Sequence, residues 1–365
     1  MKTSVSHQET AAGPTPRPRD FQMDLLRVMA CLLVMWQHAS ECYYIAPDFS
    51  PVRSDSTYTI GFLTSLCRAS VPLFVIVSGY FLLPMRGTTR EFFHRRFSRI
   101  VWPFVFWCAV YAVYYVVSRG DSWTQCLTNI LHIPVNFGTE VGHLWYVYML
   151  MGLYLLVPVI SPWLRTASKR TLQAYLGIWA VTTLLPYIHM IFPELLGECF
   201  WNPTPMLYYF TGFGGYFLLG FYLRRFGPPS GWASLLLLAA GYIVTALVFN
   251  ARIQTAESVP ALELSWQQCS CNVAMMAVGL FGLLRRIRWQ GEGLIGRLLS
   301  DNARKGYAIY LAHIIILGEL AKVIMGKTGN VAVEIPLIAI LSFLLTHLTI
   351  ALLSLLPKAR NWLGC

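Results

Sequence analysis

Charged side chains are scarce in this chain of 365 residues. Asp, Glu, Lys and Arg make up 12% of the sequence, about half the usual share in soluble proteins, whereas hydrophobic residues make up 56% and the mean hydropathy is +0.53. These values exclude an ordinary soluble globule. The formal net charge of +11 would favour nucleic acid as the partner of a soluble protein. Here the basic residues lie in the gaps between apolar runs, so a lipid bilayer explains them without nucleic acid.

Spacings typical of metal sites and signals for secretion are also missing. The nine cysteines are scattered, and the closest pair, Cys269 and Cys271, has one residue between its members. No zinc or thiol-redox spacing is therefore present, and we expect no bound metal. Residues 1–20 are polar, include several prolines and lack the apolar core of a signal peptide. We interpret them as a disordered cytoplasmic tail.

Apolar runs long enough to cross a bilayer recur through the chain. A helix needs about 20 residues to span about 30 Å of hydrocarbon. The sequence therefore predicts an all-α integral membrane protein, a polytopic bundle of about ten transmembrane helices that forms one domain over residues 21–356. A short cytoplasmic tail is expected at 357–365. The predicted spans are 21–45, 58–83, 100–118, 143–163, 171–192, 206–223, 232–250, 268–284, 306–325 and 332–356.

The basic residues predict the orientation of this bundle. With the N-terminus inside, most Lys and Arg residues of the gaps fall on the cytoplasmic side, and the outer loops hold only Arg53, Arg119, Arg252 and Lys327. The positive-inside rule then places both termini in the cytoplasm. No repeat of fixed period is visible, and we expect no soluble domain after the last span. Any chemistry is therefore expected among the helices and their short loops.

Five polar side chains lie inside the predicted spans. They are Arg27, His38, Arg68, His313 and Lys322. A charge at membrane depth costs at least about 2.5–3.5 kcal/mol, so it normally faces a polar cavity or a partner. Glu319 and Lys322, three residues apart, are expected to neutralise each other. The others predict a polar site in the interior of the bundle.

The first span carries the clearest pattern of these residues. Arg27 and His38 are eleven positions apart, which places both on nearly one helix face and about 16.5 Å apart along the axis. Glu41, three residues beyond His38, can reach its ring. A carboxylate there would hold one imidazole tautomer and make the other nitrogen a better general base. The structural alternative is that Arg27 extends to lipid phosphates and His38 bonds a neighbouring helix.

The loop before the third span is the most basic short loop. Arg96 and Arg99, at i and i+3, share a face of the helix that enters the membrane. Because guanidinium groups match phosphates, this pair predicts a clamp for a polyanion, and its alternative is a purely topological role.

The fourth span opens with His143, Trp145 and Tyr146, close to Glu140. We place this segment on the outer side, where Trp and Tyr are ordinary interfacial residues. Together with the histidine and the carboxylate, however, they would form a platform on which a sugar stacks and hydrogen-bonds.

Five motifs follow one another in the chain. They are Arg27-x10-His38, Arg68 to Phe74 leading into Ser78-Gly79-Tyr80, Arg96-x-x-Arg99, His143 to Tyr146 followed by Tyr154 and Pro158, and Ile309-Tyr310-Leu311-x-His313. In order and spacing they resemble membrane acyltransferase family 3 from about residue 20 to 356. The chain is most similar to the stand-alone branch typified by the O-acetyltransferase of enterobacterial common antigen.

The resemblance implies an enzyme of the bacterial inner (cytoplasmic) membrane. It would move an acyl group, usually acetyl, from cytoplasmic acyl-CoA to a hydroxyl of an envelope polysaccharide or lipid-linked sugar. The arm of acetyl-CoA is about as long as the helix from Arg27 to His38. We assign Arg27, Arg96 and Arg99 to the donor phosphates. Catalysis falls to His38 as base, to Glu41 as its orienting partner and to Arg68 near the acyl oxygen.

The remaining assignments leave alternatives open. His143, Trp145 and Tyr146 would bind the acceptor sugar. Direct transfer and a covalent acyl-His38 intermediate both fit the residues. The rival class is a multi-span transporter or exporter of a polysaccharide or small solute, because buried charges also mark transport paths. It should show two related halves with interrupted helices, which the sequence lacks. A third class, a non-catalytic envelope assembly protein, would be favoured by loss of His38, which is present.

Overall fold

A computed structural model describes residues 20–193, 197–199, 202–205, 207–289 and 291–365. The tail predicted at 1–20 lies outside this part of the chain except for Asp20. That residue is the N-cap of the first helix, where its carboxylate accepts a hydrogen bond from the Met23 amide at 3.2 Å. It also pairs with Arg285 at 2.7 Å, so it is held to a distant helix end.

The regular structure of the described chain consists of helices, one short antiparallel hairpin, β1 (Gly197–Cys199) and β2 (Asn202–Pro205), and one isolated β-bridge between Ile45 and Pro51. The helices of the first half are α1 (Phe21–Tyr44), α2 (Asp55–Ser65), η1 (Leu66–Ala69), α3 (Ser70–Leu82), α4 (Thr89–Ser118), α5 (Trp123–Leu131), α6 (Phe137–Glu140), α7 (Trp145–Thr166), α8 (Lys169–Thr182) and α9 (Leu185–Ile191). Those of the second half are η3 (Tyr208–Phe210), α10 (Phe213–Phe226), α11 (Gly231–Arg252), α12 (Val259–Leu262), η4 (Leu264–Trp266), α13 (Cys271–Leu284), α14 (Gly293–Ile324), α15 (Val331–Leu353) and α16 (Ala359–Leu363).

Eight helical stretches among the described residues are long and apolar enough to cross a membrane. They are Asp55–Leu82, Thr89–Ser118, Trp145–Thr166, Lys169–Ile191, Gly231–Arg252, Leu264–Leu284, Gly293–Ile324 and Val331–Leu353. Two of the ten predicted spans fall short of this description. The first, α1, has 24 residues but carries Asp24, Arg27 and Glu41, and the sixth corresponds to α10, which has only 14 residues. A full crossing by these two helices stays a prediction.

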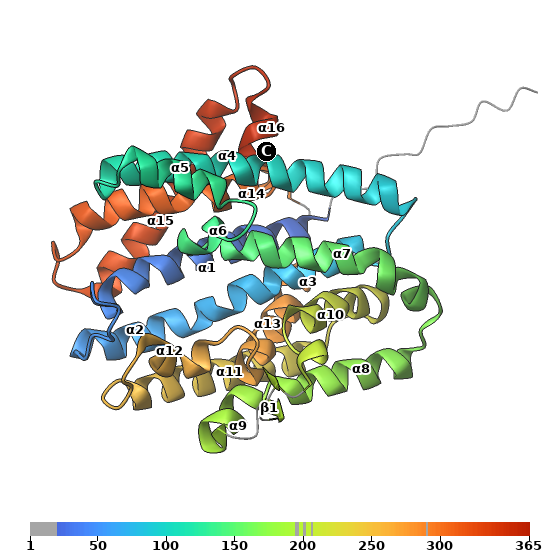
Figure 1. Cartoon of the computed structure of the whole chain (residues 1–365). Coiled ribbons are helices and arrows are strands. Elements are labelled where there is room, and N and C mark those ends of the chain that lie inside the picture. The colour runs from blue at the N-terminus through green and yellow to red at the C-terminus, as the bar shows by residue number, and fades with distance from the viewer. Residues whose placement is uncertain (1–19, 194–196, 200–201, 206, 290) are drawn as a thin grey trace, which may run out of the picture.

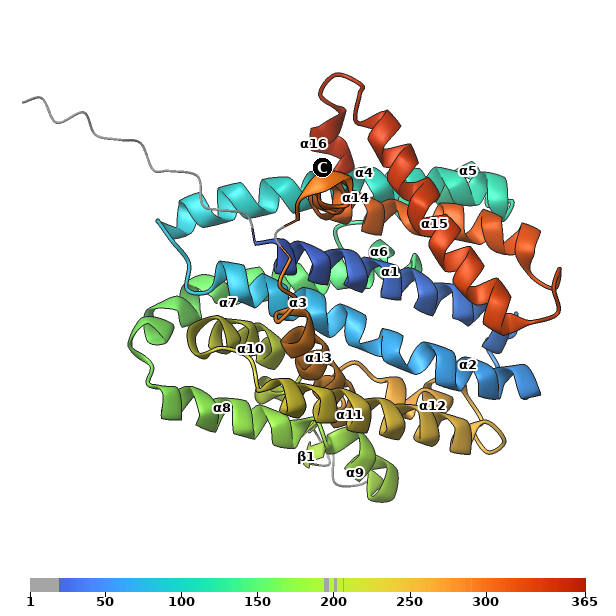
Figure 2. The ribbon, with the colours of Figure 1, turned by 180° about the vertical axis from the view of Figure 1, so that it is seen from behind.

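The helix that carries most of the candidate residues runs through the middle of the bundle. Figures 1 and 2 show α1 and the continuous α2–η1–α3 unit between two groups of helices. One group contains α4, α14, α15 and α16, and the other contains α8, α10, α11 and α13. Most side chains of α1 are accordingly buried or half-buried, and its polar residues lie among other helices.

Close helix packing brings α3 and α10 together through glycine. A Cβ atom on Gly79 would lie 1.9 Å from the carbonyl oxygen of Phe217, and one on Gly220 would lie 2.0 Å from that of Ile76. Backbones can approach this closely only where a side chain is absent, which is how small residues let membrane helices pack.

One predicted interior cation is not in the interior. The side chain of Lys322 is 61% exposed and that of Glu319 is 52% exposed, so the expectation of a buried Lys322 was wrong. Lys322 lies in the last turn of the long helix α14, where a cation is favoured by the helix dipole. The ion pair predicted between the two residues is confirmed, with 2.7 Å between Nζ and Oε1.

Candidate active site

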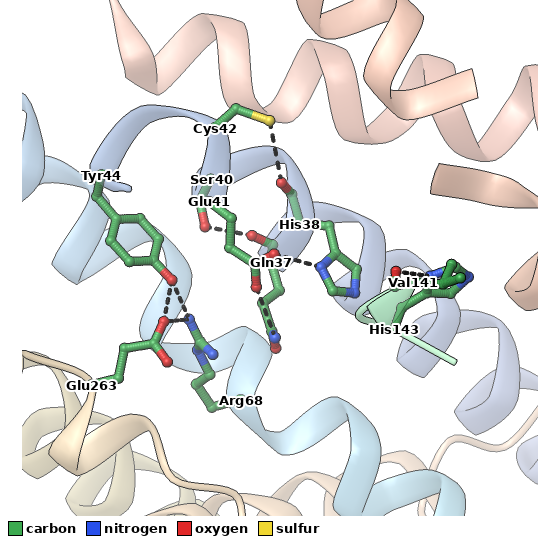
Figure 3. A network of polar contacts seen from close by, with 10 residues as sticks. All are labelled: Gln37, His38, Ser40, Glu41, Cys42, Tyr44, Arg68, Val141, His143 and Glu263. Atoms are coloured by element: carbon green, nitrogen blue, oxygen red, sulfur yellow. Dashed lines mark hydrogen bonds and ion pairs between the residues drawn. The ribbon is translucent and has the colours of Figure 1, made fainter. Parts of the chain in front are cut away.

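The centre of the candidate site is a hydrogen-bonded histidine–carboxylate pair on α1. His38 Nδ1 lies 2.6 Å from Glu41 Oε2, and the amide of Gln37 donates to the other carboxylate oxygen at 3.3 Å (Figure 3). The three residues lie within one turn of the helix, so the i, i+3 and i, i+4 spacings alone place them together. The imidazole is 15% exposed and the carboxylate 29% exposed.

Two further histidines meet His38 from other helices. The ring centroid of His313, on α14, lies 5.5 Å from that of His38, and that of His143, just before α7, lies 6.2 Å away. The ring centroids of His143 and His313 are 4.8 Å apart, and both residues are buried. Three segments distant in sequence thus form a histidine cluster, defined here as His38, His143 and His313. No group of three or more His, Cys, Asp or Glu in the described chain is placed to hold a metal ion.

Hydrogen bonding distinguishes the three rings. Both nitrogens of His143 face carbonyl oxygens, those of Val141 at 3.4 Å and Leu311 at 3.3 Å. Nδ1 of His313 lies 2.6 Å from the carbonyl of Tyr310, which assigns its proton to that nitrogen, and its Nε2 has no partner among the described residues. Only His38 has a carboxylate on Nδ1. This arrangement keeps the proton on Nδ1, leaves Nε2 as a lone pair and stabilises the ring when it gains a second proton.

A second polar group lies beside this cluster and contains Arg68. The guanidinium Nη2 lies 3.2 Å from the hydroxyl of Tyr44 and 3.4 Å from Oε1 of Glu263, and the same hydroxyl donates to Glu263 (Figure 3). The guanidinium also lies 4.0 Å from the ring centre of Trp266. Arg68 is 4% exposed, and its Nε has no hydrogen-bond partner among the described residues. These contacts neutralise a cation that would otherwise be costly to bury.

A cavity of about 1140 Å³ lies between the histidine cluster and the arginine residues at the Arg27 end of α1. Its lining includes the three arginines predicted to bind phosphates, Arg27, Arg96 and Arg99, and the described lining residues include no Asp or Glu. Arg27 is held by Asp24 at 3.1 Å and lies over the ring of Phe81. A cavity of this size with several guanidinium groups suits a large anionic ligand.

Tyrosine side chains lie between the far end of the cavity and the histidine cluster. Tyr146 and Tyr310 both line the cavity, and their rings are 5.6 Å apart. The ring of Tyr310 lies 5.4 Å from that of His143, and its hydroxyl donates to the carbonyl of His143. The cavity lining therefore ends at Tyr146 and Tyr310, and Tyr310 packs between the cavity and the histidine cluster.

The rise along two helices gives the distance between the arginines and the histidine cluster. On α1, the eleven residues from Arg27 to His38 rise about 16.5 Å. On α14, the nine residues from Arg304, another lining residue, to His313 rise about 13.5 Å. The agreement shows that the arginines and the histidines occupy two separate levels of the bundle.

The structure buries His143 and Tyr146, two members of the predicted outer platform, and the binding of an acceptor sugar by His143, Trp145 and Tyr146 stays a prediction. The chain before α7 turns inward through α6 and Gly142, whose φ of +80° suits glycine, and this turn buries His143. Tyr146 faces the arginine-lined cavity, and Trp145 packs on Phe213 with 5.6 Å between ring centroids. The prediction treated the start of the span as the membrane surface, whereas the preceding residues form part of the core.

Several members of the site were missed by sequence reasoning. His313 was noticed as a buried histidine but received no role, and Tyr310 was noted only as part of a motif. Glu263 gave no local signal, because it is 195 residues from Arg68 and lies in a loop. Tyr44 is an ordinary aromatic at the end of a span by sequence. Only the fold brings these side chains to the site.

One of three comparisons with known proteins gives a match. A family model described as an acyltransferase domain matches residues 20–355, which contain every residue discussed so far in this site. No curated protein and no solved structure matches the chain. The matched segment ends before α16.

Proposed function

The chain belongs to acyltransferase family 3 through the match over residues 20–355, and on this premise we propose that it is an integral membrane O-acyltransferase. The donor would be cytoplasmic acyl-CoA with acetyl as its acyl group, as in the stand-alone O-acetyltransferase branch. The acceptor would be a hydroxyl of an envelope polysaccharide or a lipid-linked sugar, and the membrane the inner membrane of a bacterium. The observation that carries the proposal is the arginine-lined cavity whose lining ends at Tyr310, the residue that packs on the histidine cluster.

The length of acyl-CoA suits the distance between the arginines and the histidine cluster. Coenzyme A carries its phosphates at one end and the thioester at the end of an uncharged arm. Phosphates held by Arg96, Arg99 and Arg27 would direct the arm along the cavity toward Tyr146 and Tyr310. The thioester would then stop beside the histidines, because the helix rise of about 13.5–16.5 Å between the levels is comparable to the length of the arm.

The base of the reaction would be Nε2 of His38. It takes the proton of the acceptor hydroxyl as the oxygen attacks the thioester carbonyl, and Glu41 stabilises the imidazolium that forms. The tetrahedral intermediate collapses with cleavage of the carbon–sulfur bond, and the proton passes from His38 to the departing thiolate. This sequence balances as a direct transfer, and we propose it over an acyl-His38 intermediate because the carboxylate on Nδ1 suits a base.

The role of Arg68 near the acyl oxygen stays part of the proposal. Its Nη2 contacts Tyr44 and Glu263, and its positive charge also acts on Glu41. A fixed positive charge in a site of low dielectric would stabilise negative charge that develops on the substrate. The same contacts give Arg68 a positioning role through Tyr44 and Glu263.

The test is thioester consumption by the purified protein in detergent. The protein is supplied with acetyl-CoA and a glycolipid fraction from its host membranes, and release of the CoA thiol is followed with a thiol reagent. We expect release that depends on both substrates. A transporter would leave the thioester intact, and this result would overturn the proposal. Mass spectrometry of envelope glycans from a deletion strain would then identify acceptor and acyl group through the missing mass increment.

A further inference from the structure

The segment predicted as a short tail at 357–365 is folded against the bundle. Helix α16 packs beside α4 (Figure 1), where the indole of Trp107 donates to the carbonyl of Leu363 at 3.3 Å. The side chain of Leu363 is buried, and a Cβ atom on Gly364 would lie 2.9 Å from the ring of Tyr307. This segment is thus seated on two helices that line the cavity.

The same segment supplies part of the cavity wall. Its lining residues include Arg360 and Trp362. Trp102 of α4 also lines the cavity, and its ring centroid lies 6.1 Å from that of Trp362. Both indoles are about half exposed, at 56% and 51%. The indole rings of Trp102 and Trp362 are therefore accessible to a ligand that also contacts the arginines of the cavity.

The charges around these indoles are positive. Arg99, Arg304 and Arg360 line the cavity together with the two tryptophans. Arg304 is held by Asp301 at 3.2 Å, while Arg99 and Arg360 make no ion pair with a described residue. Guanidinium groups bind phosphates, and indole rings stack on flat bases. A phosphorylated nucleotide combines both features in one ligand.

The position of this surface separates it from the reacting end of the cavity. Arg304 lies nine residues before His313 on α14, a rise of about 13.5 Å. Tyr307, against which Gly364 packs, lies one turn before Tyr310, which contacts the histidine cluster. The ligand part bound by α16 is therefore remote from the thioester.

We propose that α16 and Trp102 form a nucleotide subsite for the CoA donor. Arg360 would contact a phosphate of the 3′-phospho-ADP moiety, and Trp362 with Trp102 would pack on the adenine. The inference rests on the proposed function, and it adds a binding element that lies beyond the matched residues 20–355. The competing role for the two indoles is contact with lipid headgroups at the membrane surface.

The experiment compares two ligands on the full-length protein in detergent. CoA contains the nucleotide, and 4′-phosphopantetheine lacks it. Affinities are measured by calorimetry for the wild type, for Arg360→Ala and for Trp362→Ala. We expect each substitution to weaken CoA binding by about tenfold, the size of one lost stacking or phosphate contact. Binding of 4′-phosphopantetheine should stay unchanged. Arg90→Ala and Trp232→Ala, at exposed positions outside the cavity lining, serve as matched controls.

The possible outcomes separate the two proposals. A wild-type protein that binds no CoA would overturn the proposed function itself. If the wild type binds CoA and both variants bind it equally well, the nucleotide subsite is wrong while the proposed function stands. A parallel loss of affinity for CoA and 4′-phosphopantetheine would assign α16 a purely structural role, and would also overturn the subsite. Arg360→Lys should retain part of the affinity that Arg360→Ala loses, because it keeps the charge.

Discussion

At the scale of single residues, the candidate chemistry depends on how three similar rings are bonded. Both nitrogens of His143 face carbonyl oxygens, to only one of which a neutral ring can donate, and Nδ1 of His313 donates to the carbonyl of Tyr310. His38 alone pairs with a carboxylate and retains a second nitrogen without a partner among the described residues. A base needs a free lone pair and a group that stabilises the protonated ring, so His38 is the best suited of the three.

The first prediction concerns His38. His38→Gln keeps the size and hydrogen-bonding ability of the side chain but removes the base, so we expect the acylation rate to fall about 10²–10⁴-fold. CoA binding should remain, because the arginines lie at another level of the bundle. The rate is measured by thiol release at matched amounts of inserted protein, and His189→Gln, at an exposed position on α9, is the control. If His38→Gln kept more than about a tenth of the rate and His313→Gln abolished it, His313 would be the base.

The second prediction concerns the arginine pair on α4. Arg96→Ala and Arg99→Ala each remove a phosphate contact that is the same in the ground state and the transition state. The KM for acetyl-CoA should therefore rise about tenfold with little change in kcat. Steady-state kinetics with varied donor gives both constants. Arg95→Ala is the matched control, because this neighbour is exposed and does not line the cavity. A lower kcat at saturating donor with an unchanged KM would remove the pair from the donor site.

At the scale of helices, α1 owes its role to its neighbours. It carries Asp24, Arg27 and Glu41, and it lies inside the bundle between other helices. Helices α14 and α15 pack on one side of it, and α3 packs on another. Because α3 is held in turn to α10 by the glycine contacts, the position of the site depends on close packing between helices that carry no catalytic residue.

The third prediction tests this packing. Gly220→Ala adds a methyl group where a Cβ atom would lie 2.0 Å from a backbone oxygen of Ile76, so α3 and α10 must move apart. The loss of stability should reach at least about 1–3 kcal/mol, as for other overpacked sites. Thermal unfolding in detergent, followed by size-exclusion chromatography, measures it. Gly318→Ala is the control, because no atom lies within 4 Å of its added Cβ and alanine favours the helix. Equal melting temperatures for the two variants would show that this crossing tolerates separation.

At the scale of the whole molecule, the two levels of the bundle imply two sides of the membrane. The arginine-lined cavity takes its charged lining from the first half of α1, from the basic end of α4, from the first half of α14 and from α16. The loop over 119–142 follows the opposite end of α4. Charge asymmetry of this kind predicts that the cavity faces the cytoplasm, where acyl-CoA is found.

The fourth prediction is the orientation itself. On a cysteine-free background, Thr124→Cys should react with an impermeant thiol reagent added to intact cells. Arg90→Cys, on the basic end of α4, should react only after the membrane is permeabilised. Both positions are exposed in the structure, so accessibility does not depend on the packing of the bundle. Strong labelling of Arg90→Cys in intact cells would reverse the orientation and the assignment of the donor side.

Local patterns in the sequence were sufficient for features within one helix. The apolar runs predicted the long helices, because the length of a span follows from the thickness of the bilayer. The spacing of Arg27, His38 and Glu41 predicted a shared face, because helix geometry is regular. The pairing of Lys322 with Glu319 followed from the same regularity, although its exposure depended on which face of α14 meets other helices.

Contacts between distant segments were decided only by the tertiary structure. The sequence by itself determined a helical membrane protein of the acyltransferase class with a polar stripe on its first helix. Tertiary packing turned His143 inward from the expected surface, brought His313 to His38, and joined Arg68 to Glu263 and Tyr44. It also folded the C-terminal residues over the cavity. The physical reason is that helix periodicity sets which residues of one helix share a face, whereas the packing of apolar surfaces from all helices decides which faces meet.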